Sequence, residues 1–174
     1  SISLQTQEET IKVPITFIPE VPQFINYLSA WQAGPFPTYL KNSLIIIVCI
    51  IALQMIIMVP AAYGFAKYEF KGKRILFGLV LIAFMTPTQI TFLPIYQMMA
   101  KWSVMDTLIP QIIPFITNAF GIFLLRQYFM QIPDELIEAA KLDNASELQI
   151  VYRLMLPMSK PAMATIILFS FVSN

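Results

Sequence analysis

Long runs of residues without a single charge constrain this chain more than any other feature. Residues 42–66, 75–100 and 107–125 contain no Lys, Arg, Asp or Glu. A helix that crosses the hydrocarbon core of a bilayer needs about 20 predominantly apolar residues, so each run is long enough. Hydrophobic residues make up 57% of the sequence and charged residues 12%, whereas soluble domains carry roughly 25% charge. The sequence therefore predicts an all-α polytopic membrane protein.

The order of these runs predicts the organisation of the chain. Residues 1–39 are polar and Pro-rich, show no signal peptide and are expected to form an external segment. Residues 40–174 are expected to form a transmembrane core, with a cytoplasmic loop at 131–160. A last apolar run, 161–174, is too short to cross and is interpreted as the start of a truncated span. We therefore expect an internal fragment of a larger, six-span subunit.

The distribution of Lys and Arg predicts the orientation of the chain. Eight of the eleven basic residues lie in two loops, Lys67–Arg74 and the segment from Arg126 to Lys160. Basic residues are enriched in cytoplasmic loops, and it is their number rather than the net charge that sets topology. Both loops are therefore expected inside, and the N-terminal segment outside.

Polar residues within the apolar runs are candidates for a transport path or for helix contacts. Thr86–Pro87–Thr88–Gln89 interrupts the second run, and broken backbone in a membrane is tolerated only against protein or a water-filled cavity. Thr86, Gln89 and Thr91, with Asn118 in the third run, are possible contacts along such a path; a packing kink is the alternative. For Gln54 in the first run, we favour a hydrogen bond to a neighbouring helix.

The segment Ile132–Pro161 predicts a helical hairpin. Pro133 suits a first helical turn, and Asp134 and Glu135 suit the positive end of the helix dipole. Leu136, Ala139 and Ala140 then give one small face, and the run is expected to end near Asn144, which tolerates a left-handed turn. A second run carries Leu148, Val151, Tyr152 and Met155 at helical spacing and is expected to stop at Pro157. Such a hairpin suits docking to another protein.

This segment resembles the EAA loop of ABC-importer permeases. The matching residues are Glu138, Ala139, Ala140, Asp143, Asn144, Ala145, Leu156 and Pro157. The family has a Gly in the turn, where this chain has Asn144, which can adopt a positive φ at modest cost. Further stretches resemble the carbohydrate and glycerol-3-phosphate branch, among them Ala62–Lys67 and Phe123–Phe129. The resemblance implies a fragment of an ABC-importer type I transmembrane domain.

What the resemblance implies about function follows from that family. The chain would be a permease subunit of an ATP-driven importer, for sugars or oligosaccharides, in a prokaryotic inner or plasma membrane. Its implied partners are cytoplasmic ABC ATPase subunits, a second and different permease subunit, an extracellular or periplasmic solute-binding protein, and the lipid bilayer. Glu138 would anchor the loop in the ATPase, and Ala139 and Ala140 would allow close approach. Glycerol phosphate is an alternative solute.

The sequence argues against several other classes of protein. It contains no His, one Cys and no Gly-rich phosphate loop, so no metal site and no cofactor are expected, and ATP would be bound by the partner subunit. A net charge of +1 argues against nucleic acid binding. A membrane-embedded enzyme would need charged or nucleophilic clusters that the three uncharged runs lack. A membrane scaffold or a passive channel subunit remains an alternative.

Overall fold

The computed structural model describes residues 2–11, 18–19 and 21–173, and every element in these residues is helical. The chain divides into two compact units, Ser1–Leu44 and Ile45–Asn174. Helix α3 (Phe36–Lys67) begins in the first unit and continues into the second. Each unit is described below by itself.

The first unit is joined in part by the side chain of Asn26. It contains the 3-10 turn η1 (Ile2–Leu4), α1 (Gln7–Ile11) and α2 (Ile25–Gln32). The Asn26 side-chain amide donates to the carbonyl oxygens of Ser3 and Gln5 at 3.1 and 3.0 Å. The two short turns near the N-terminus were not expected from the sequence. Residues 12–17 and 20, which belong to the predicted external segment, lie outside the described residues.

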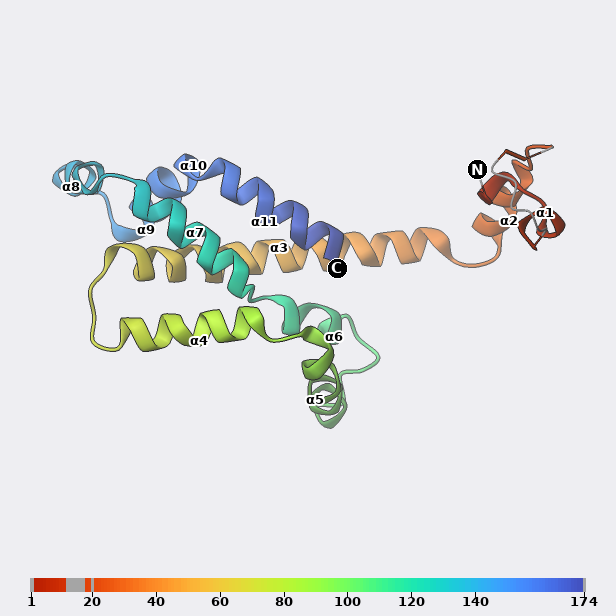
Figure 1. The fold of residues 1–174 in the computed structure, drawn as a ribbon, viewed down its shortest axis with the longest axis horizontal. Helices are drawn as coiled ribbons and strands as arrows, with labels where there is room; N and C mark the ends of the chain where they lie inside the picture. The colour runs from red at the N-terminus through yellow and green to blue at the C-terminus, as the bar shows by residue number, and fades with distance from the viewer. Residues whose placement is uncertain (1, 12–17, 20, 174) are drawn as a thin grey trace. The chain divides into compact units, whose positions relative to one another are not determined.

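The second unit contains the long apolar helices (Figure 1). After α3 come α4 (Lys73–Met85), α5 (Thr88–Lys101), α6 (Ile109–Ile112), the turn η2 (Ile113–Phe115), α7 (Ala119–Gln131) and, at the end, α11 (Lys160–Ser173). Among the described residues, two helical stretches are long and apolar enough to cross a membrane, Phe36–Lys67 and Ile109–Gln131. The number rises to four if each of two bent helix pairs forms one span.

The first bent pair confirms the predicted interruption of the second apolar run. Helices α4 and α5 meet at an angle of 98°. Thr86, the last residue before Pro87, has φ −76° and ψ 122°, the extended conformation that a following proline favours. The Thr86 hydroxyl donates to the Ile82 carbonyl oxygen at 2.8 Å and so satisfies an acceptor at the end of α4. The bend therefore follows from Pro87 and its predecessor.

The third apolar run forms a helix that continues past its uncharged part. Asn118 begins α7 as its N-cap, and its side-chain oxygen accepts the Gly121 amide at 3.1 Å. The helix then runs through Arg126 to Gln131, whereas the sequence suggested an end at Leu125. The side-chain oxygen of Asn118, one of the predicted path residues, thus caps its own helix.

A buried polar contact joins α3, the turn η2 and α11. The Gln54 side-chain amide donates to the Phe115 carbonyl oxygen at 2.8 Å, and the Ser170 hydroxyl donates to Gln54 Oε1 at 2.7 Å. Gln54 and Ser170 are 2% and 1% exposed, so these bonds satisfy groups that would otherwise be costly to bury. The predicted interhelical role of Gln54 is confirmed.

The hydrophobic core lies where α3, α7 and α11 meet the segment 132–158. Its buried residues include Met58 and Tyr63 of α3, Leu125 of α7 and Ile166 of α11. Gly121 permits the close approach of α7 to α3, because a Cβ built there would lie 2.5 Å from the sulfur of Met58. This packing places the hairpin predicted from the sequence at one end of the helices (Figure 1).

Candidate functional site

The candidate site is a helical hairpin between α7 and α11. Its first arm is α8 (Asp134–Leu142), which follows the extended residue Pro133 and has Asp134 and Glu135 in its first turn. Its second arm is one bent helical run, composed of α9 (Glu147–Gln149), the π-helical segment η3 (Ile150–Met155) and α10 (Leu156–Met158). The acidic residues at the start of α8 and Lys141 at its end each interact favourably with the helix dipole.

The turn between the arms depends on Asn144. This residue has φ 58°, so the predicted left-handed turn is confirmed. The Asn144 amide donates to the Lys141 carbonyl oxygen and the Ala145 amide to that of Ala140, both at 3.0 Å. This pair of bonds is the Schellman motif, which ends helices at a left-handed residue that is usually glycine. Asparagine thus does here what glycine does in the EAA consensus.

The second arm begins with a capping box. The Ser146 side chain accepts the Gln149 amide at 3.4 Å, and the Gln149 side-chain oxygen accepts the Ser146 amide at 2.8 Å. Two amides that a helix start leaves without partners are thereby satisfied. The hydrogen bonds of the turn and of the capping box together fix the path of residues 142–149.

The π-helical segment changes which residues of the second arm face the core. Val151 and Met155 are buried as predicted, but Leu148 is 66% exposed and Ile150 is buried in its place. The helical spacing predicted one shared face for Leu148, Val151 and Met155, and for Leu148 this prediction is wrong. A π-turn inserts an extra residue, so the face rotates relative to the 3.6-residue period. Pro157 also does not stop the arm at once, because α10 continues to Met158.

The inward face of α8 also differs from the predicted one. Ile137 is 6% exposed and belongs to the core, while Leu136 is 39% exposed. Ala140 and Ala145 pack against the core from the two sides of the turn. The predicted small face of Leu136, Ala139 and Ala140 thus divides, with Ala140 facing inward. Ile137 was missed, although an isoleucine among charged neighbours on a short helix is a usable signal for an anchor.

A lysine at the end of α3 fastens the start of the hairpin. Lys67 Nζ donates to the Ile132 carbonyl oxygen at 2.5 Å and to Asp134 Oδ1 at 2.6 Å. The Lys67 side chain is 9% exposed and Asp134 75%, so the ammonium is held inside while the carboxylate remains in solvent. Two bonds to one ammonium resist bending between α3 and α8.

Glu147 connects both arms to the end of α3. Its Oε1 lies 3.0 Å from Lys141 Nζ, and its Oε2 accepts the Tyr63 hydroxyl at 3.0 Å. Hydrogen bonding from Lys141, and then from Tyr68, holds the pKa of Glu147 below its ordinary value. Burial, followed by the nearby Glu147 carboxylate, raises the pKa of Tyr68. Glu147 is therefore ionised at neutral pH and ties α8, α9 and α3 together.

The surface of the hairpin that remains exposed is called here the outer face. It comprises Glu138, Ala139, Leu142 and Leu148, and Leu142 is 84% exposed. Exposed large leucines on both sides of a tight turn are costly in water and are typical of a surface that a partner covers. The sequence reasoning missed Leu142; its position directly before the Asp143–Asn144 turn, opposite Leu148, is the signal that points to it.

The other predicted residues of the loop lie around this face. Asp143 and Asn144 are exposed at the turn, Leu156 is half-buried against the core, and Pro157 is exposed where the second arm bends by 85° into α11. Of the predicted path residues, Thr86 and Gln89 flank the bend between α4 and α5, and Thr91 follows on α5. Asn118 lies on a separate element, at the start of α7.

The hairpin is fastened both to α3 and to the hydrophobic core. Within the described residues, no group of three His, Cys, Asp or Glu side chains could hold a metal ion. The hairpin is joined to α3 by Lys67 and Tyr63 and to the core by Ile137 and Met155. A protein that pushes on the outer face would therefore move these helices together.

Comparison with known proteins agrees with this architecture. Residues 57–174 match the model of the family described as "Binding-protein-dependent transport system inner membrane component". The chain is 33% identical over 153 residues to the arabinooligosaccharides transport system permease protein AraQ of Halalkalibacterium halodurans, covering 87% of this chain and 55% of that protein. It is 28% identical over 171 residues to the sn-glycerol-3-phosphate transport system permease protein UgpE of Pectobacterium atrosepticum, covering 95% and 61%.

Comparison with solved structures also finds a transport protein. The chain aligns with a bacterial ABC transporter involved in the import of the acidic polysaccharide alginate, with a TM-score of 0.82 and 28% identity. The alignment covers 99% of this chain and 61% of that one. The chain thus spans less than two thirds of the length of the solved transporter chain and of each of the two relatives above. The matched family model covers more than half of the chain, and the all-helical fold agrees with it. The chain therefore belongs to the inner-membrane permease family of binding-protein-dependent transport systems.

Proposed function

We propose that this chain is part of a permease subunit of an ATP-driven ABC importer for sugars or oligosaccharides. The observation that supports this most is the hairpin of residues 132–158, which is tied to α3 and the core but presents an exposed apolar and acidic outer face. The protein itself would not be an enzyme; ATP would be bound and hydrolysed by ATPase subunits that grip this face.

The proposed mechanism is a two-state movement biased by nucleotide. When the ATPase subunits close on ATP, they move the outer face, and the Lys67 and Tyr63 contacts carry that movement into α3. The spans then change between inward-facing and outward-facing arrangements. Glu138 would bind donors in the ATPase, Ala139 would allow close approach, and Leu142 and Leu148 would fill apolar hollows. Asp143 and Asn144 would contribute through the shape of the turn.

The proposed topology places the hairpin in the cytoplasm and residues 1–39 outside. Eight of the eleven basic residues then lie in cytoplasmic loops. The remaining proposed partners are a second, different permease subunit that completes the pathway and an external solute-binding protein that delivers the solute. Thr86, Gln89, Thr91 and Asn118 are proposed to line the path, because three of them lie at or beside the broken α4–α5 segment.

The proposed solute class follows from the relatives. One is named for arabinooligosaccharides and one for sn-glycerol-3-phosphate, while the solved transporter imports an acidic polysaccharide. Two of these three names denote carbohydrates, so a sugar or oligosaccharide is proposed first and a glycerol phosphate second. Uptake of labelled arabinooligosaccharide and of labelled glycerol-3-phosphate by cells that express the complete transporter separates the two.

The docking role is tested by charge reversal on the outer face. Glu138→Lys and Ala139→Asp in the full-length protein are expected to abolish co-purification of the ATPase and solute uptake, while membrane insertion stays normal. Asp106→Lys makes the same charge change as Glu138→Lys in the turn between α5 and α6, at a position that is also exposed. It is expected to leave ATPase co-purification unchanged. Normal uptake in Glu138→Lys or Ala139→Asp would contradict the proposal.

A different measurement distinguishes an ATP-driven importer from a passive channel or a scaffold subunit. Uptake against a concentration gradient is expected to stop when the ATPase subunits are deleted or carry an inactive nucleotide site. Steady solute movement without any ATPase subunit would identify a channel instead.

A further inference from the structure

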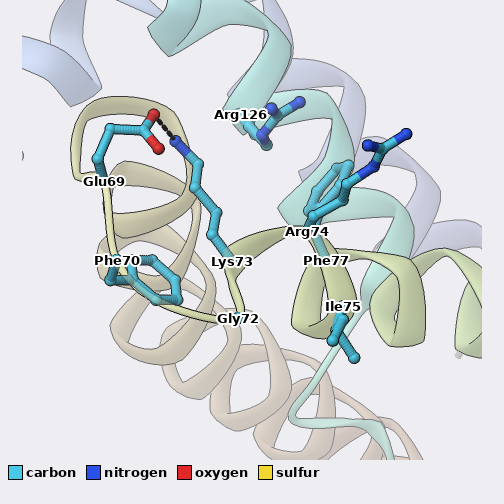
Figure 2. Close-up of a pocket in the computed structure, with 8 residues that line it drawn as sticks. All are labelled: Glu69, Phe70, Gly72, Lys73, Arg74, Ile75, Phe77 and Arg126. Atoms are coloured by element: carbon cyan, nitrogen blue, oxygen red, sulfur yellow. Dashed lines mark hydrogen bonds and ion pairs between the residues drawn. The ribbon is translucent and has the colours of Figure 1, made fainter.

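A second site lies at the turn between α3 and α4. It is a cavity of about 570 Å³ between the turn Glu69–Arg74, the start of α4 and Arg126 of α7 (Figure 2). A cavity of this volume lies in the range of small-ligand sites. The hairpin function described above makes no use of it.

The cavity carries an excess of positive charge. Lys73, Arg74 and Arg126 line it together with one acid, Glu69. Lys73 Nζ lies 2.7 Å from Glu69 Oε1 and donates to the Tyr68 carbonyl oxygen at 2.9 Å, so this pair is internally satisfied. Among the residues that the structure describes, no carboxylate lies within ion-pair distance of Arg74 or Arg126. Two positive charges are therefore left for a ligand.

Arg126 is held in position for an anion. Its Nε donates to the Phe65 carbonyl oxygen at 3.1 Å, and its guanidinium carbon lies 4.2 Å from the centre of the Phe77 ring. These contacts fix the plane of the guanidinium and leave its two terminal nitrogens as donors, the geometry that binds phosphate well. Figure 2 shows Arg126, Arg74 and Lys73 extending their charged ends to the same side of the turn at Gly72.

The start of α4 adds further donors to the same cavity. Gly72 precedes the helix with φ 86° and offers no side chain to cap it. The first amides of a helix have no partner within the helix and carry partial positive charge. The Lys73 amide already donates to the Phe70 carbonyl oxygen at 3.2 Å, so a phosphate beside the Gly72 turn would meet the remaining amides of the first turn as well as the two arginines.

An apolar stripe leads away from the cavity along α4. Ile75, which lines the cavity, is followed at helical spacing by Leu79 and Ile82, and these three are 72%, 55% and 63% exposed. The other side of α4 is occupied by packing against α7, where Phe77 meets Phe123 and Phe84 meets Phe120 at 6.4 and 5.6 Å between ring centres. Figure 2 shows that the Ile75 side chain points away from Arg74 and Arg126, so the stripe begins beside the two arginines. A ligand with a phosphate head and an acyl chain matches this arrangement, with its head at the arginines and its chain on the neighbouring face of α4.

We propose that the Glu69–Arg74 turn and Arg126 form a binding site for the phosphate of an anionic phospholipid of the inner leaflet, whose acyl chain lies along Ile75, Leu79 and Ile82. Basic pockets between membrane helices on the cytoplasmic side are suited to such head groups. This proposal rests on the proposed function only in that it places the site on the cytoplasmic side of the membrane. Its test measures lipid retention and needs neither ATPase activity nor transport, so either proposal can fail alone.

The test uses the complete transporter, reconstituted in nanodiscs that contain equal parts of phosphatidylglycerol and phosphatidylcholine, and counts retained lipids by native mass spectrometry. Wild type is expected to retain phosphatidylglycerol selectively. Arg74→Gln and Arg126→Gln are expected to lower this retention by about tenfold, the loss of one charge-assisted contact. The matched control is Lys71→Gln, which removes the same charge from an exposed residue of the same turn that does not line the cavity. It is expected to retain the lipid as wild type does.

Four outcomes would overturn the proposal. Equal loss in Lys71→Gln and Arg74→Gln would show a diffuse surface charge, and equal retention of phosphatidylcholine would show no head-group selection. Arg74-dependent binding of inorganic phosphate to the delipidated complex, as tight as that of long-chain phosphatidylglycerol, would show a site for a free anion. Loss of ATPase co-purification in Arg74→Gln with unchanged lipid retention would show a contact for the acidic surface of a protein partner.

Discussion

The hydroxyl of Tyr63 donates a hydrogen bond of 3.0 Å to Glu147, a residue 84 positions further along the chain. Tyr63 lies in the last turns of α3 and is 4% exposed, while Glu147 begins the second arm of the hairpin. One buried phenol thus joins the longest apolar helix to the proposed docking element. Any movement of the hairpin relative to α3 must break this bond or carry α3 along.

Removing the Tyr63 hydroxyl is expected to weaken that connection without a gross change of fold. Tyr63→Phe should lower stability by about 1 kcal/mol, the usual net worth of one such hydrogen bond. Tyr152→Phe is the matched control, because its hydroxyl makes a longer, exposed bond of 3.3 Å to the Ile56 carbonyl oxygen. Thermal unfolding of the purified complex measures both variants. A loss in Tyr152→Phe as large as in Tyr63→Phe would contradict the role given to the buried bond.

The left-handed turn at Asn144 predicts opposite effects for two substitutions. Asn144→Gly should be close to neutral, because glycine adopts a positive φ without steric cost. Asn144→Val should destabilise the hairpin by at least about 1–2 kcal/mol, because a β-branched residue is strained at φ 58°. Unfolding temperature and ATPase co-purification check this pair. Equal behaviour of the two variants would mean that the turn does not depend on residue 144.

The contacts of Glu147 predict a loss of stability in acid. The pKa of Glu147 is lowered in the folded protein, so its stabilising effect is present above the unfolded value of 4.5 and is lost as pH falls through the folded pKa. The pKa of Lys141 is raised, so its contribution is present below 10.5 and is lost only as pH rises above that value. Melting temperature measured across acid pH should therefore fall less steeply in Glu147→Gln than in wild type. Parallel curves would rule out a contribution from Glu147.

The close approach at Gly121 predicts a packing cost. Gly121→Ala places a Cβ 2.5 Å from the Met58 sulfur, so the buried Met58 side chain must shift. Overpacking of this kind costs about 1–3 kcal/mol, which a helix-propensity gain of up to about 1 kcal/mol offsets only in part. Gly78→Ala is the matched control in α4, where a Cβ meets nothing within 4 Å and should stabilise the helix by up to about 1 kcal/mol. Thermal unfolding of both variants is the measurement. Partial rescue of Gly121→Ala by Met58→Val would locate the strain at this contact.

Local signals in the sequence predicted much of the fold because they act over a few residues. Uncharged runs indicated the long helices, Pro87 the bend after α4, and Asn144 the turn of the hairpin. Gln54 was assigned to a helix contact because an amide at that depth needs a partner, and the structure gives it two. In each case the cause lies within the residue or its near neighbours.

The parts of the hairpin that the sequence did not reveal depend on distant residues or on a break in period. Tyr63 and Lys67 bind residues far along the chain, and nothing in local spacing pairs them with Glu147 or Asp134. The π-helical segment shifts the buried face, so a 3.6-residue pattern assigned Leu148 inward although it is exposed. The docking role of Glu138 and Ala139 stays a prediction; both side chains are exposed on the outer face.

The Lys67 contact also limits how many times the segment between Lys67 and Ile132 can cross the bilayer. Because its ammonium binds the Ile132 carbonyl oxygen and Asp134, both ends of the intervening segment must emerge on one side, which demands an even number of crossings. The helical stretch Ile109–Gln131 is long and apolar enough to supply one crossing. With that crossing, a re-entrant dip by α4 and α5, entering and leaving by the same side, would make the count odd. We therefore predict that the bent α4–α5 pair passes right through the membrane.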